Sequence, residues 1–271
     1  MVHSYQHGQL LPRQTAIVAE FPLALRVNGR DLATLVASRH DLRYLVAGFL
    51  RLQGFVDRVE DFDLLAVCDE FGVANVRIRS ELPEQLRPVL TSGCGTGLSF
   101  SLTQPEGLQV AAAGIAPQAL FRLMAELARQ ADQYRSHGGI HSAAVGGPDG
   151  RLLLYAEDLG RHNTLDRIAG EALFKQLDLG GLLLVTSGRI SAEMALKAAR
   201  LGVTCIASRT SPTDMAVTIC QQAGLALIGY LRGEQFTVYS GAERIKLQQQ
   251  RPQLQRVDGF TNTYYQQQAV C

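Results

Sequence analysis

The amino-acid sequence predicts an α/β protein, in which a mainly parallel sheet flanked by helices follows a small N-terminal α+β domain. From Ala116 onward, short apolar runs alternate with amphipathic stretches of helical length, which is typical of a sheet covered on both faces. Before Ala116, strand-like runs joined by turn residues surround one helical stretch. Because 271 residues exceed what one core usually organises, we expect two domains, residues 1–113 and 114–271.

The N-terminal domain is expected to contain two hairpins and one helix. Asn28-Gly29 is a strong hairpin turn signal, and Phe71-Gly72 marks the second turn. Asp41 is a suitable N-cap for the helix, and Gly54 is a suitable stop. The expected strands are residues 15–27, 31–38, 64–69 and 73–79, and the expected helix is residues 42–53.

A glycine-rich segment follows these elements. Residues 91–97 read Thr-Ser-Gly-Cys-Gly-Thr-Gly, which is too rich in glycine for a helix or a strand. We expect this segment to open a linker that extends to about Gly114.

The C-terminal domain is expected to begin with a helix that has Pro117 in its first turn, a favourable position for proline. A hairpin turned at Pro148-Asp149-Gly150 comes next. The remaining pattern alternates strands and helices, and the tail from Gln248, rich in glutamine and tyrosine, is expected to be weakly ordered. The expected helices are residues 117–134, 163–177, 191–200 and 212–223, and the expected strands are 140–146, 151–156, 182–185, 203–207, 225–231 and 235–239.

Composition and charge argue against several classes of protein. Hydrophobic residues make up 46% of the chain and charged residues 19%, as in ordinary globular proteins. The formal net charge of +1 provides no global field that would favour nucleic acid or an anionic membrane. No apolar run reaches the roughly 20 residues needed to cross a bilayer, and the first 13 residues lack the features of a signal peptide. A cytoplasmic protein is therefore the expectation.

Three polar motifs occupy equivalent positions between a strand and the next helix. If the strands run parallel, the motifs gather at the carboxyl edge of the sheet, where open α/β sheets bind ligands. Each motif also opens a helix, whose free N–H groups favour an anion, and each contains an arginine that can bind phosphate. The pattern predicts a site for a nucleotide or another phosphate-bearing ligand. The motifs are residues 157–163 (Glu-Asp-Leu-Gly-Arg-His-Asn), 187–191 (Ser-Gly-Arg-Ile-Ser) and 208–213 (Ser-Arg-Thr-Ser-Pro-Thr).

A structural interpretation of the same motifs stands beside the functional one. Asn163, Ser191 and Ser211 are good N-cap residues, and capping alone would explain their positions. His162 is a candidate proton carrier or ligand contact, but a capping or structural role is equally compatible with its place beside a helix start. His137 and His141 flank two glycines, so they cannot form a helical metal-ligand pair, and no metal site is expected.

Cys94 is the outstanding single residue of the sequence. Glycines on both sides leave its thiol accessible and its backbone mobile, as a sulfur carrier requires, although a cysteine can also simply be tolerated in a loop. Cys68 and Cys205 lie in apolar strand runs, and Cys220 lies on an expected helix, so these three fit small core residues. The total of five cysteines, without any Cys-x-x-Cys pair, argues against a disulfide framework or a structural zinc site.

At these motifs the sequence resembles the formate dehydrogenase accessory family known as FdhD or NarQ. The resemblance extends from about Glu20 to Tyr239 and includes several long motifs. The matching residues are 157–163 with Asp166; Ser187, Gly188, Arg189, Ser191, Glu193, Met194 and Lys197; Gly138, Gly139, Ile140 and His141; Ser211, Pro212 and Thr213; and, nearer the N-terminus, Glu20, Pro22, Leu23, Asn28, Gly29, Gly48, Phe49 and Leu50.

The resemblance implies a cytidine-deaminase-like fold for the second domain and a sulfurtransferase function. Such proteins take sulfur as a persulfide from a cysteine desulfurase and pass it to the bis-molybdopterin guanine dinucleotide cofactor before the cofactor enters formate dehydrogenase. Cys94 corresponds to the persulfide carrier, and a homodimer is the implied assembly. Deaminase chemistry is not implied, because the zinc-binding His-x-Glu and Cys-x-x-Cys signatures are absent from the sequence.

The cofactor is expected to contact two groups of residues. One is the segment that the resemblance assigns to the cofactor, and the other comprises the strand-to-helix motifs. These expected cofactor-binding residues are Tyr230, Leu231, Arg232, Gly233, Glu234 and Gln235, together with Arg161, His162, Asn163, Ser187, Arg189, Ser211 and Thr213.

One departure from the family pattern concerns how sulfur leaves. Many members carry Cys-Gly-x-Cys-Gly in this loop, whereas residues 94–97 here are Cys-Gly-Thr-Gly. Cys94 would therefore deliver sulfur directly or with an external reductant. A binding module that carries the cofactor without moving sulfur is the alternative. A nucleotide-hydrolysing enzyme has little support, since the sequence lacks a Gly-x-x-x-x-Gly-Lys-Ser/Thr loop.

Overall fold

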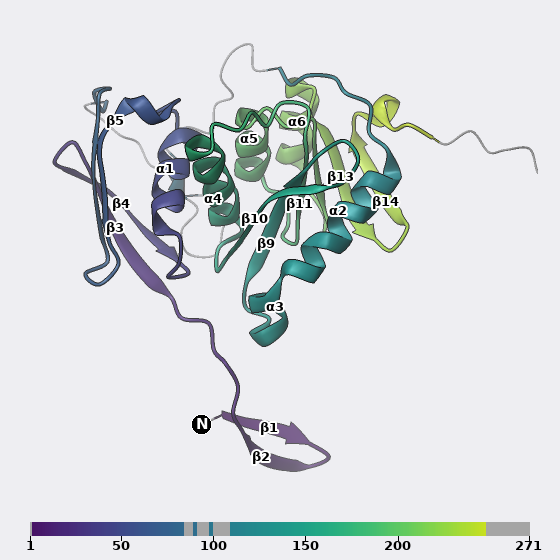
Figure 1. The fold of residues 1–271 in the computed structure, drawn as a ribbon. Helices are drawn as coiled ribbons and strands as arrows, with labels where there is room; N and C mark the ends of the chain where they lie inside the picture. The colour runs from purple at the N-terminus through teal and green to yellow at the C-terminus, as the bar shows by residue number, and fades with distance from the viewer. Residues whose placement is uncertain (1, 84–88, 91–97, 100–108, 248–271) are drawn as a thin grey trace, which may run out of the picture.

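The computed structural model describes residues 2–83, 89–90, 98–99 and 109–247 and contains two α/β units packed side by side (Figure 1). The α/β class is confirmed, with a small α+β unit before a larger helix-flanked sheet. The C-terminal tail from Gln248 lies outside the described residues. No helix in the described part of the chain is long and apolar enough to span a membrane.

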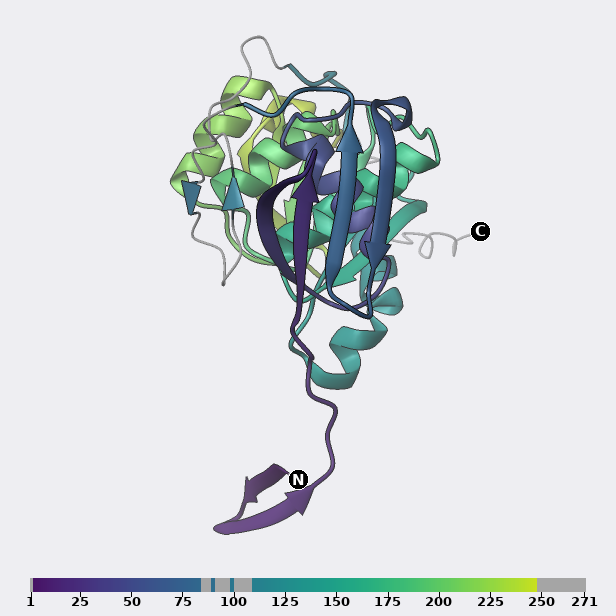
Figure 2. The ribbon, with the colours of Figure 1, turned by 90° about the vertical axis from the view of Figure 1, so that its left-hand side faces the viewer.

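The chain begins with a hairpin that was not expected from the sequence. Strands β1 (Val2–Gln6) and β2 (Gln9–Arg13) pair antiparallel, and they lie away from the body of the molecule in both views (Figures 1 and 2). His7 and Gly8 form the turn with φ values of 48° and 84°. Two successive positive φ values are typical of the tight turn that joins two strands directly.

The small unit is a four-stranded sheet in the order β4-β3-β6-β5 covered by one helix (Figure 2). Asn28 and Gly29 turn the β3–β4 hairpin as predicted, with φ values of 51° and 80°. Alternate residues of β3, such as Leu23 and Leu25, are buried against Leu45 of the helix. The elements are β3 (Phe21–Val27), β4 (Arg30–Ala37), α1 (Leu42–Leu52), the 3-10 turn η1 (Val59–Asp61), β5 (Phe62–Cys68) and β6 (Val73–Ile78).

Two details of this unit differ from the prediction. The first strand begins at Phe21 rather than at residue 15. Asp41 occupies the N-cap position of α1, but its side chain makes no capping hydrogen bond, and its backbone has a left-handed conformation with φ 42°. The Asp41 carboxylate lies instead 3.3 Å from Nδ1 of His40.

The larger unit contains a six-stranded sheet in the order β10-β9-β11-β12-β13-β14. Strands β11, β12 and β13 are parallel to one another, but β9 is antiparallel to both of its neighbours and β14 is antiparallel to β13. The sheet is thus mixed: β10, β11, β12 and β13 run in one direction, and β9 and β14 run in the other. Its strands are β9 (His141–Gly146), β10 (Leu152–Asp158), β11 (Leu183–Thr186), β12 (Cys205–Ser208), β13 (Ala226–Arg232) and β14 (Gln235–Ser240).

Helices cover both faces of this sheet. Leu123 of α2 packs with Val185 on one face, whereas Ile168 of α4 and Met194 of α5 pack with Leu184 on the other. The helix predicted for residues 117–134 is divided at Ala131 into two helices. The helices are α2 (Pro117–Gln130), α3 (Asp132–His137), α4 (Arg161–Phe174), α5 (Ala192–Arg200), α6 (Asp214–Ala223) and the 3-10 turn η2 (Ala242–Arg244).

The two units meet where α1 packs on α4 (Figure 1). Gly48 of α1 approaches the α4 backbone so closely that a Cβ atom there would lie 1.7 Å from the carbonyl oxygen of Asp166. Gly170 of α4 is equally confined, with 2.0 Å between a Cβ and the Tyr44 carbonyl oxygen. Only glycine fits at either position, so the helices touch backbone to backbone. This contact places α1 of the small unit against the middle of α4.

Candidate functional site at the edge of the larger sheet

The three polar motifs lie along one edge of the six-stranded sheet. Strand β10 runs in the same direction as β11, because both are antiparallel to β9, and β12 and β13 run parallel to β11. The carboxyl ends of all four strands therefore meet at this edge, together with the start of β9. The gathering predicted from the sequence is confirmed, although the sheet is mixed.

Hydrogen bonds join neighbouring motifs along the edge. The Ser187 amide donates to the Ser142 carbonyl oxygen at 2.9 Å, and the Ser208 hydroxyl donates to the Gly188 carbonyl oxygen at 2.6 Å. The Tyr230 amide donates to the Thr210 carbonyl oxygen at 3.0 Å. These bonds join the start of β9, the second motif, the third motif and the segment at the end of β13 into one row along the edge.

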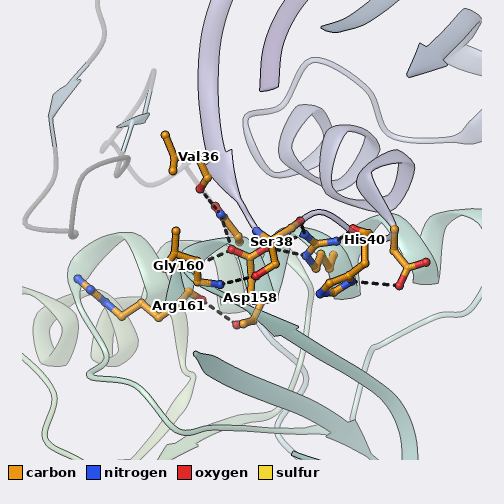
Figure 3. A network of polar contacts seen from close by, with 11 residues as sticks. Val36, Ser38, His40, Asp158, Gly160 and Arg161 are labelled. Atoms are coloured by element: carbon orange, nitrogen blue, oxygen red, sulfur yellow. Dashed lines mark hydrogen bonds and ion pairs between the residues drawn. The ribbon is translucent and has the colours of Figure 1, made fainter. Parts of the chain in front are cut away.

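The first motif contains a fully buried carboxylate, that of Asp158, at the end of β10. Its Oδ1 accepts hydrogen bonds from the Gly160 amide at 2.9 Å and from Nδ2 of Asn163 at 2.7 Å. Its Oδ2 accepts two from Arg167, through Nε at 2.8 Å and Nη2 at 2.6 Å (Figure 3). A buried charge needs such compensation, since desolvation of an unpaired carboxylate is very unfavourable.

The same group of side chains holds the small unit in place. Arg167 also donates to the carbonyl oxygens of Ser38, at 2.7 Å, and of His40. The Ser38 hydroxyl accepts from the Leu159 amide at 3.1 Å, and the Ser38 amide donates to Asp158 at 3.3 Å (Figure 3). We call Ser38, Asp158, Asn163 and Arg167 the interdomain clamp.

Two predicted site residues of the first motif point in different directions. Asn163 lies inside α4 rather than at its N-cap, which is Gly160, so the capping interpretation of Asn163 was wrong. Its Nδ2 donates to the Val36 carbonyl oxygen at 2.9 Å as well as to Asp158, which directs the side chain to the domain boundary. The Arg161 side chain extends away from the clamp (Figure 3).

A second buried network lies beneath the edge, between α4 and α5. Nε2 of His162 lies 3.2 Å from the Ser191 hydroxyl and 3.3 Å from Oε2 of Glu193. Nζ of Lys197 lies 3.2 Å from Glu193 Oε1 and 2.8 Å from Asp166 Oδ2. All five side chains are buried. The network balances one ammonium group against two carboxylates.

This network has the residue types of a hydrolytic triad but not its geometry. In a triad the histidine contacts the nucleophile through one ring nitrogen and the carboxylate through the other. Here Ser191 and Glu193 both approach the same atom, Nε2 of His162. The imidazole therefore cannot pass a proton from Ser191 toward Glu193 in the manner of a hydrolase. Ser191 holds the N-cap position of α5 as expected, but without a side-chain capping bond.

Burial controls the charges in this network. Desolvation, opposed by Glu193, lowers the pKa of His162 to about 3, so the imidazole is neutral at physiological pH. Desolvation raises the pKa of Asp166 to about 6 despite the nearby Lys197 ammonium. The two carboxylates outweigh burial at Lys197, and the pKa of this ammonium group is raised. A neutral His162 is suited to holding the starts of α4 and α5 together, not to carrying a proton near pH 7.

Replacing His162 by glutamine is expected to change how stability depends on pH. The folded-state pKa of His162 is depressed, so its contribution is present above the unfolded pKa of about 6.5 and is lost as pH falls. The raised pKa of Asp166 changes stability with pH in the opposite direction, but Asp166 is present in both the wild type and His162→Gln. The difference in unfolding free energy between the wild type and His162→Gln should therefore shrink by up to about 1.4 kcal/mol per pH unit below pH 6.5. Urea unfolding at pH 7, 6 and 5 measures this difference.

The control for this prediction is His3→Gln, because His3 is an exposed residue of β1. Its unfolding free energy should follow that of the wild type at every pH. A difference between wild type and His162→Gln that stays constant from pH 7 to pH 5 would contradict the neutral, buried state of His162.

The second and third motifs place their predicted residues at different depths. Ser187 is half-buried, and its hydroxyl accepts from the Ser142 amide at 3.0 Å, whereas Arg189 is exposed. Thr213, not Ser211, caps α6, and its hydroxyl accepts from the Ala216 amide at 3.4 Å. The expectation that Ser211 is an N-cap was therefore wrong. Its carbonyl oxygen accepts from the Ile190 amide and joins the second motif to the third.

The segment at the end of β13 is exposed except for one residue. Tyr230 has a left-handed backbone, with φ 53°, and its side chain is exposed, whereas Leu231 is buried. Arg232 donates through Nε to the Arg209 carbonyl oxygen at 2.9 Å, and Gly233 turns the chain into β14 with φ 56°. Glu234 and Gln235 line a hollow of about 470 Å³, together with Pro117, Gln118, Phe121 and Phe236. The segment thus presents side chains at the same edge as the three motifs.

Sequence reasoning missed His141 as a member of the site. It is the first residue of β9 and lies beside the second motif, with Nδ1 3.5 Å from the Ser187 hydroxyl. Its spacing from His137 led only to a metal pair that was rejected, and the family resemblance included His141 without giving it a role. The useful signal was its position at the start of a strand. In the described part of the chain, no three histidine, cysteine or acidic side chains come together as a potential metal site.

Cys94, the expected sulfur carrier, lies outside the described residues. On either side of it, β7 (Val89–Leu90) and β8 (Leu98–Ser99) pair antiparallel. Of the other cysteines in the described ranges, Cys205 and Cys220 are buried as expected, whereas Cys68 is exposed, so the expectation that it is a core residue was wrong. Burial raises the pKa of the Cys205 thiol to about 12, which leaves that thiol protonated and unreactive.

Comparison with known proteins places this geometry in context. A model of the FdhD/NarQ family matches residues 18–246. The sulfur carrier protein FdhD of Bacillus pumilus is 34% identical over 252 residues, which cover 90% of this chain and 96% of that protein. The proteins of the same name from Bacillus licheniformis and Staphylococcus haemolyticus are 33% and 32% identical, covering 90% and 89% of this chain and 95% and 94% of their own lengths.

A solved structure has a similar fold. The crystal structure of a candidate formate dehydrogenase accessory protein from Desulfotalea psychrophila matches with a TM-score of 0.73 and 24% sequence identity. The match covers 90% of this chain and 96% of that protein. Together with the family match over most of the chain, these similarities show that the chain belongs to the FdhD/NarQ family.

Proposed function

We propose that this chain is a sulfur carrier that serves formate dehydrogenase. The similarity of the chain to relatives named sulfur carrier protein FdhD supports this function most strongly. This similarity extends over about nine-tenths of the chain. The donor in this proposal is a cysteine desulfurase, and the acceptor is the bis-molybdopterin guanine dinucleotide cofactor. The chain would bind this cofactor as its substrate before the cofactor enters formate dehydrogenase.

The edge of the larger sheet is the proposed binding surface for the cofactor. Two guanine dinucleotide arms contain several phosphate groups, which backbone N–H groups at helix starts and arginine side chains bind well. The starts of α4, α5 and α6 all lie on this edge, with Arg161 and Arg189 beside them. The exposed Tyr230 and the turn from Arg232 to Gln235 continue the surface and suit the larger groups of the cofactor.

Cys94 is the proposed sulfur-carrying residue. Its thiolate attacks the terminal sulfur of the persulfide on the desulfurase, a new S–S bond forms on Cys94, and the desulfurase thiolate leaves. The loop contains no second cysteine to displace the sulfur. In this proposal an external thiol attacks the Cys94 sulfur and supplies the two electrons. The S–S bond of the persulfide breaks, the terminal sulfur leaves as hydrosulfide for uptake by the bound cofactor, and a mixed disulfide with the thiol remains on Cys94.

Intact mass under non-reducing conditions tests the first step of this proposal. The chain would be incubated with a cysteine desulfurase and cysteine, with Cys94→Ala and Cys68→Ala run beside the wild type. We expect wild type and Cys68→Ala to gain one sulfur atom that a reducing agent removes, and Cys94→Ala to gain none. Cys68 is a suitable control because it is an exposed free cysteine in the described part of the chain.

Two results would contradict sulfur transfer through Cys94. Equal sulfur loading of Cys94→Ala and wild type would place the carrier elsewhere. No loading of any of the three proteins, together with binding of the cofactor by the wild type, would favour a binding module that carries the cofactor without moving sulfur.

A further inference from the structure

His141 occupies a defined position at the sheet edge, between the ends of β10 and β11. It begins β9, pairs across the sheet with Asp158, and is half-buried. Its Nδ1 lies 3.5 Å from the Ser187 hydroxyl, and that hydroxyl already accepts a hydrogen bond from the Ser142 amide at 3.0 Å. The hydroxyl hydrogen of Ser187 is therefore available to Nδ1, which favours the neutral tautomer with its proton on Nε2.

Gly188 brings the His141 ring and the Arg161 side chain together. A Cβ atom at Gly188 would lie 3.1 Å from Nδ1 of His141 and 3.0 Å from Cβ of Arg161. Both residues thus lie against the bare backbone of the turn that follows β11. The absence of a side chain at position 188 allows two nitrogen-rich groups from β9 and α4 to approach the same turn.

The charges around His141 suit an anion. Burial, followed by the positive charge of Arg161, lowers the pKa of His141, while Asp158 opposes this shift. His162 is the other titratable group near it, and it is neutral at physiological pH. Asp158 is held in the clamp by Arg167, which leaves Arg161 as the charge with the larger influence on the ring. A bound anion would relieve the unfavourable interaction between Arg161 and a protonated His141.

We propose that His141 is a ligand-contacting residue of this site, whose Nε2–H donates a hydrogen bond to a phosphate oxygen of a nucleoside diphosphate group. The Ser187 hydroxyl favours this tautomer, and the Gly188 turn lies against both the ring and the Arg161 side chain. The proposal rests on the proposed function, because it names a contact for the nucleotide arms of the cofactor. It extends that function by assigning a donor from β9, an element outside the three motifs.

Binding of guanosine diphosphate, measured by calorimetry, tests this contact. We expect His141→Ala to bind roughly tenfold more weakly than the wild type, the effect of one lost hydrogen bond. His141→Gln should retain most of the affinity, since its side-chain amide can donate from nearly the same position as Nε2. His3→Gln, on the distant β1, should bind like the wild type. Circular dichroism and thermal unfolding would verify that each variant is folded.

The pH dependence of binding separates a ligand contact from a structural role. A bound phosphate stabilises the protonated imidazole, so the affinity of the wild type should rise relative to that of His141→Gln between pH 7.5 and 5.5. Comparing these two proteins removes the titration of the phosphate itself, whose second pKa is about 6. A residue that only supports the fold would weaken binding equally at every pH.

The outcomes distinguish this proposal from the proposed function. Tight binding of guanosine diphosphate by the wild type, with equal affinity in His141→Ala, would overturn the role of His141 and leave the cofactor site standing. Failure of the wild type to bind either guanosine diphosphate or the cofactor would overturn the site at this edge, and His141 with it. Loss of affinity without any change in pH dependence would reduce His141 to a structural residue.

Discussion

Replacing Cys94 by alanine is expected to abolish the formate dehydrogenase activity of cells in which this chain is the only sulfur carrier for that enzyme. Without the thiolate no persulfide can form at this position, and the cofactor would reach the enzyme without its sulfur. Activity should fall to the level of cells that lack the gene. Formate-dependent reduction of a dye in cell extracts measures the effect.

The matched control is Cys68→Ala, which removes an exposed thiol from β5 and should retain full activity. Immunoblotting would verify that all variants accumulate to the same level. Wild-type activity in cells that express Cys94→Ala would rule out a sulfur-carrying role for this residue and would favour the binding-module alternative.

Replacing Arg167 by methionine is expected to destabilise the protein by roughly 3–5 kcal/mol, the usual cost of leaving a buried charge without its partner. Arg167 and Asp158 are both almost completely buried, and Arg167 also donates to the carbonyl oxygens of Ser38 and His40. Urea unfolding, followed by far-UV circular dichroism, gives the loss. Arg167→Lys should recover only part of it, because one ammonium group cannot replace the several donors of a guanidinium.

The control is Arg79→Met, since Arg79 pairs with Asp63 on the solvent-exposed surface of the small unit. This substitution should cost less than about 1 kcal/mol, as is usual for exposed pairs. The double variant Asp158→Asn with Arg167→Met should lose less stability than the sum of the two single variants, because the buried charge is removed together with its partner. Equal losses for Arg167→Met and Arg79→Met would contradict the clamp.

Local signals in the sequence predicted most of the elements. The Asn28-Gly29 turn, the helix that starts at Leu42 and the hairpin around Pro148-Asp149-Gly150 were all confirmed. These features depend on residues close together in the chain, where turn residues and the spacing of apolar residues indicate the conformation. The same rules, applied to His7-Gly8, would have indicated the N-terminal hairpin, because a glycine that follows a residue tolerant of positive φ favours a two-residue turn.

The direction of the strands was harder to predict from the sequence. The alternation of strands and helices after Asn163 correctly indicated parallel pairing of β11, β12 and β13. The sequence does not show that β9, which precedes that alternation, inserts between β10 and β11. Pairing between strands distant in the chain depends on packing of the whole sheet, so the local pattern overestimated the parallel content.

The buried polar networks show the clearest limit of sequence reasoning. Asn163 has the preferences of a cap, and Glu193 and Lys197 have the spacing of an exposed helix pair. In the structure all three are buried. Glu193 and Lys197 pair with each other but also have partners on α4, and Asn163 has partners on β4 and β10. Residue type alone could not distinguish a side chain that binds a ligand from one that joins two units, because both roles use the same donors and acceptors.

The clamp also has a consequence for synthesis on the ribosome. Ser38 is separated from Asp158 by 120 positions and from Arg167 by 129. At a synthesis rate of roughly 5–20 residues per second, on the order of ten seconds pass between the synthesis of α1 and that of α4. During that interval the face of α1 that α4 will cover is open to water. A nascent chain of this protein therefore keeps this face of α1 exposed until about residue 170 has emerged.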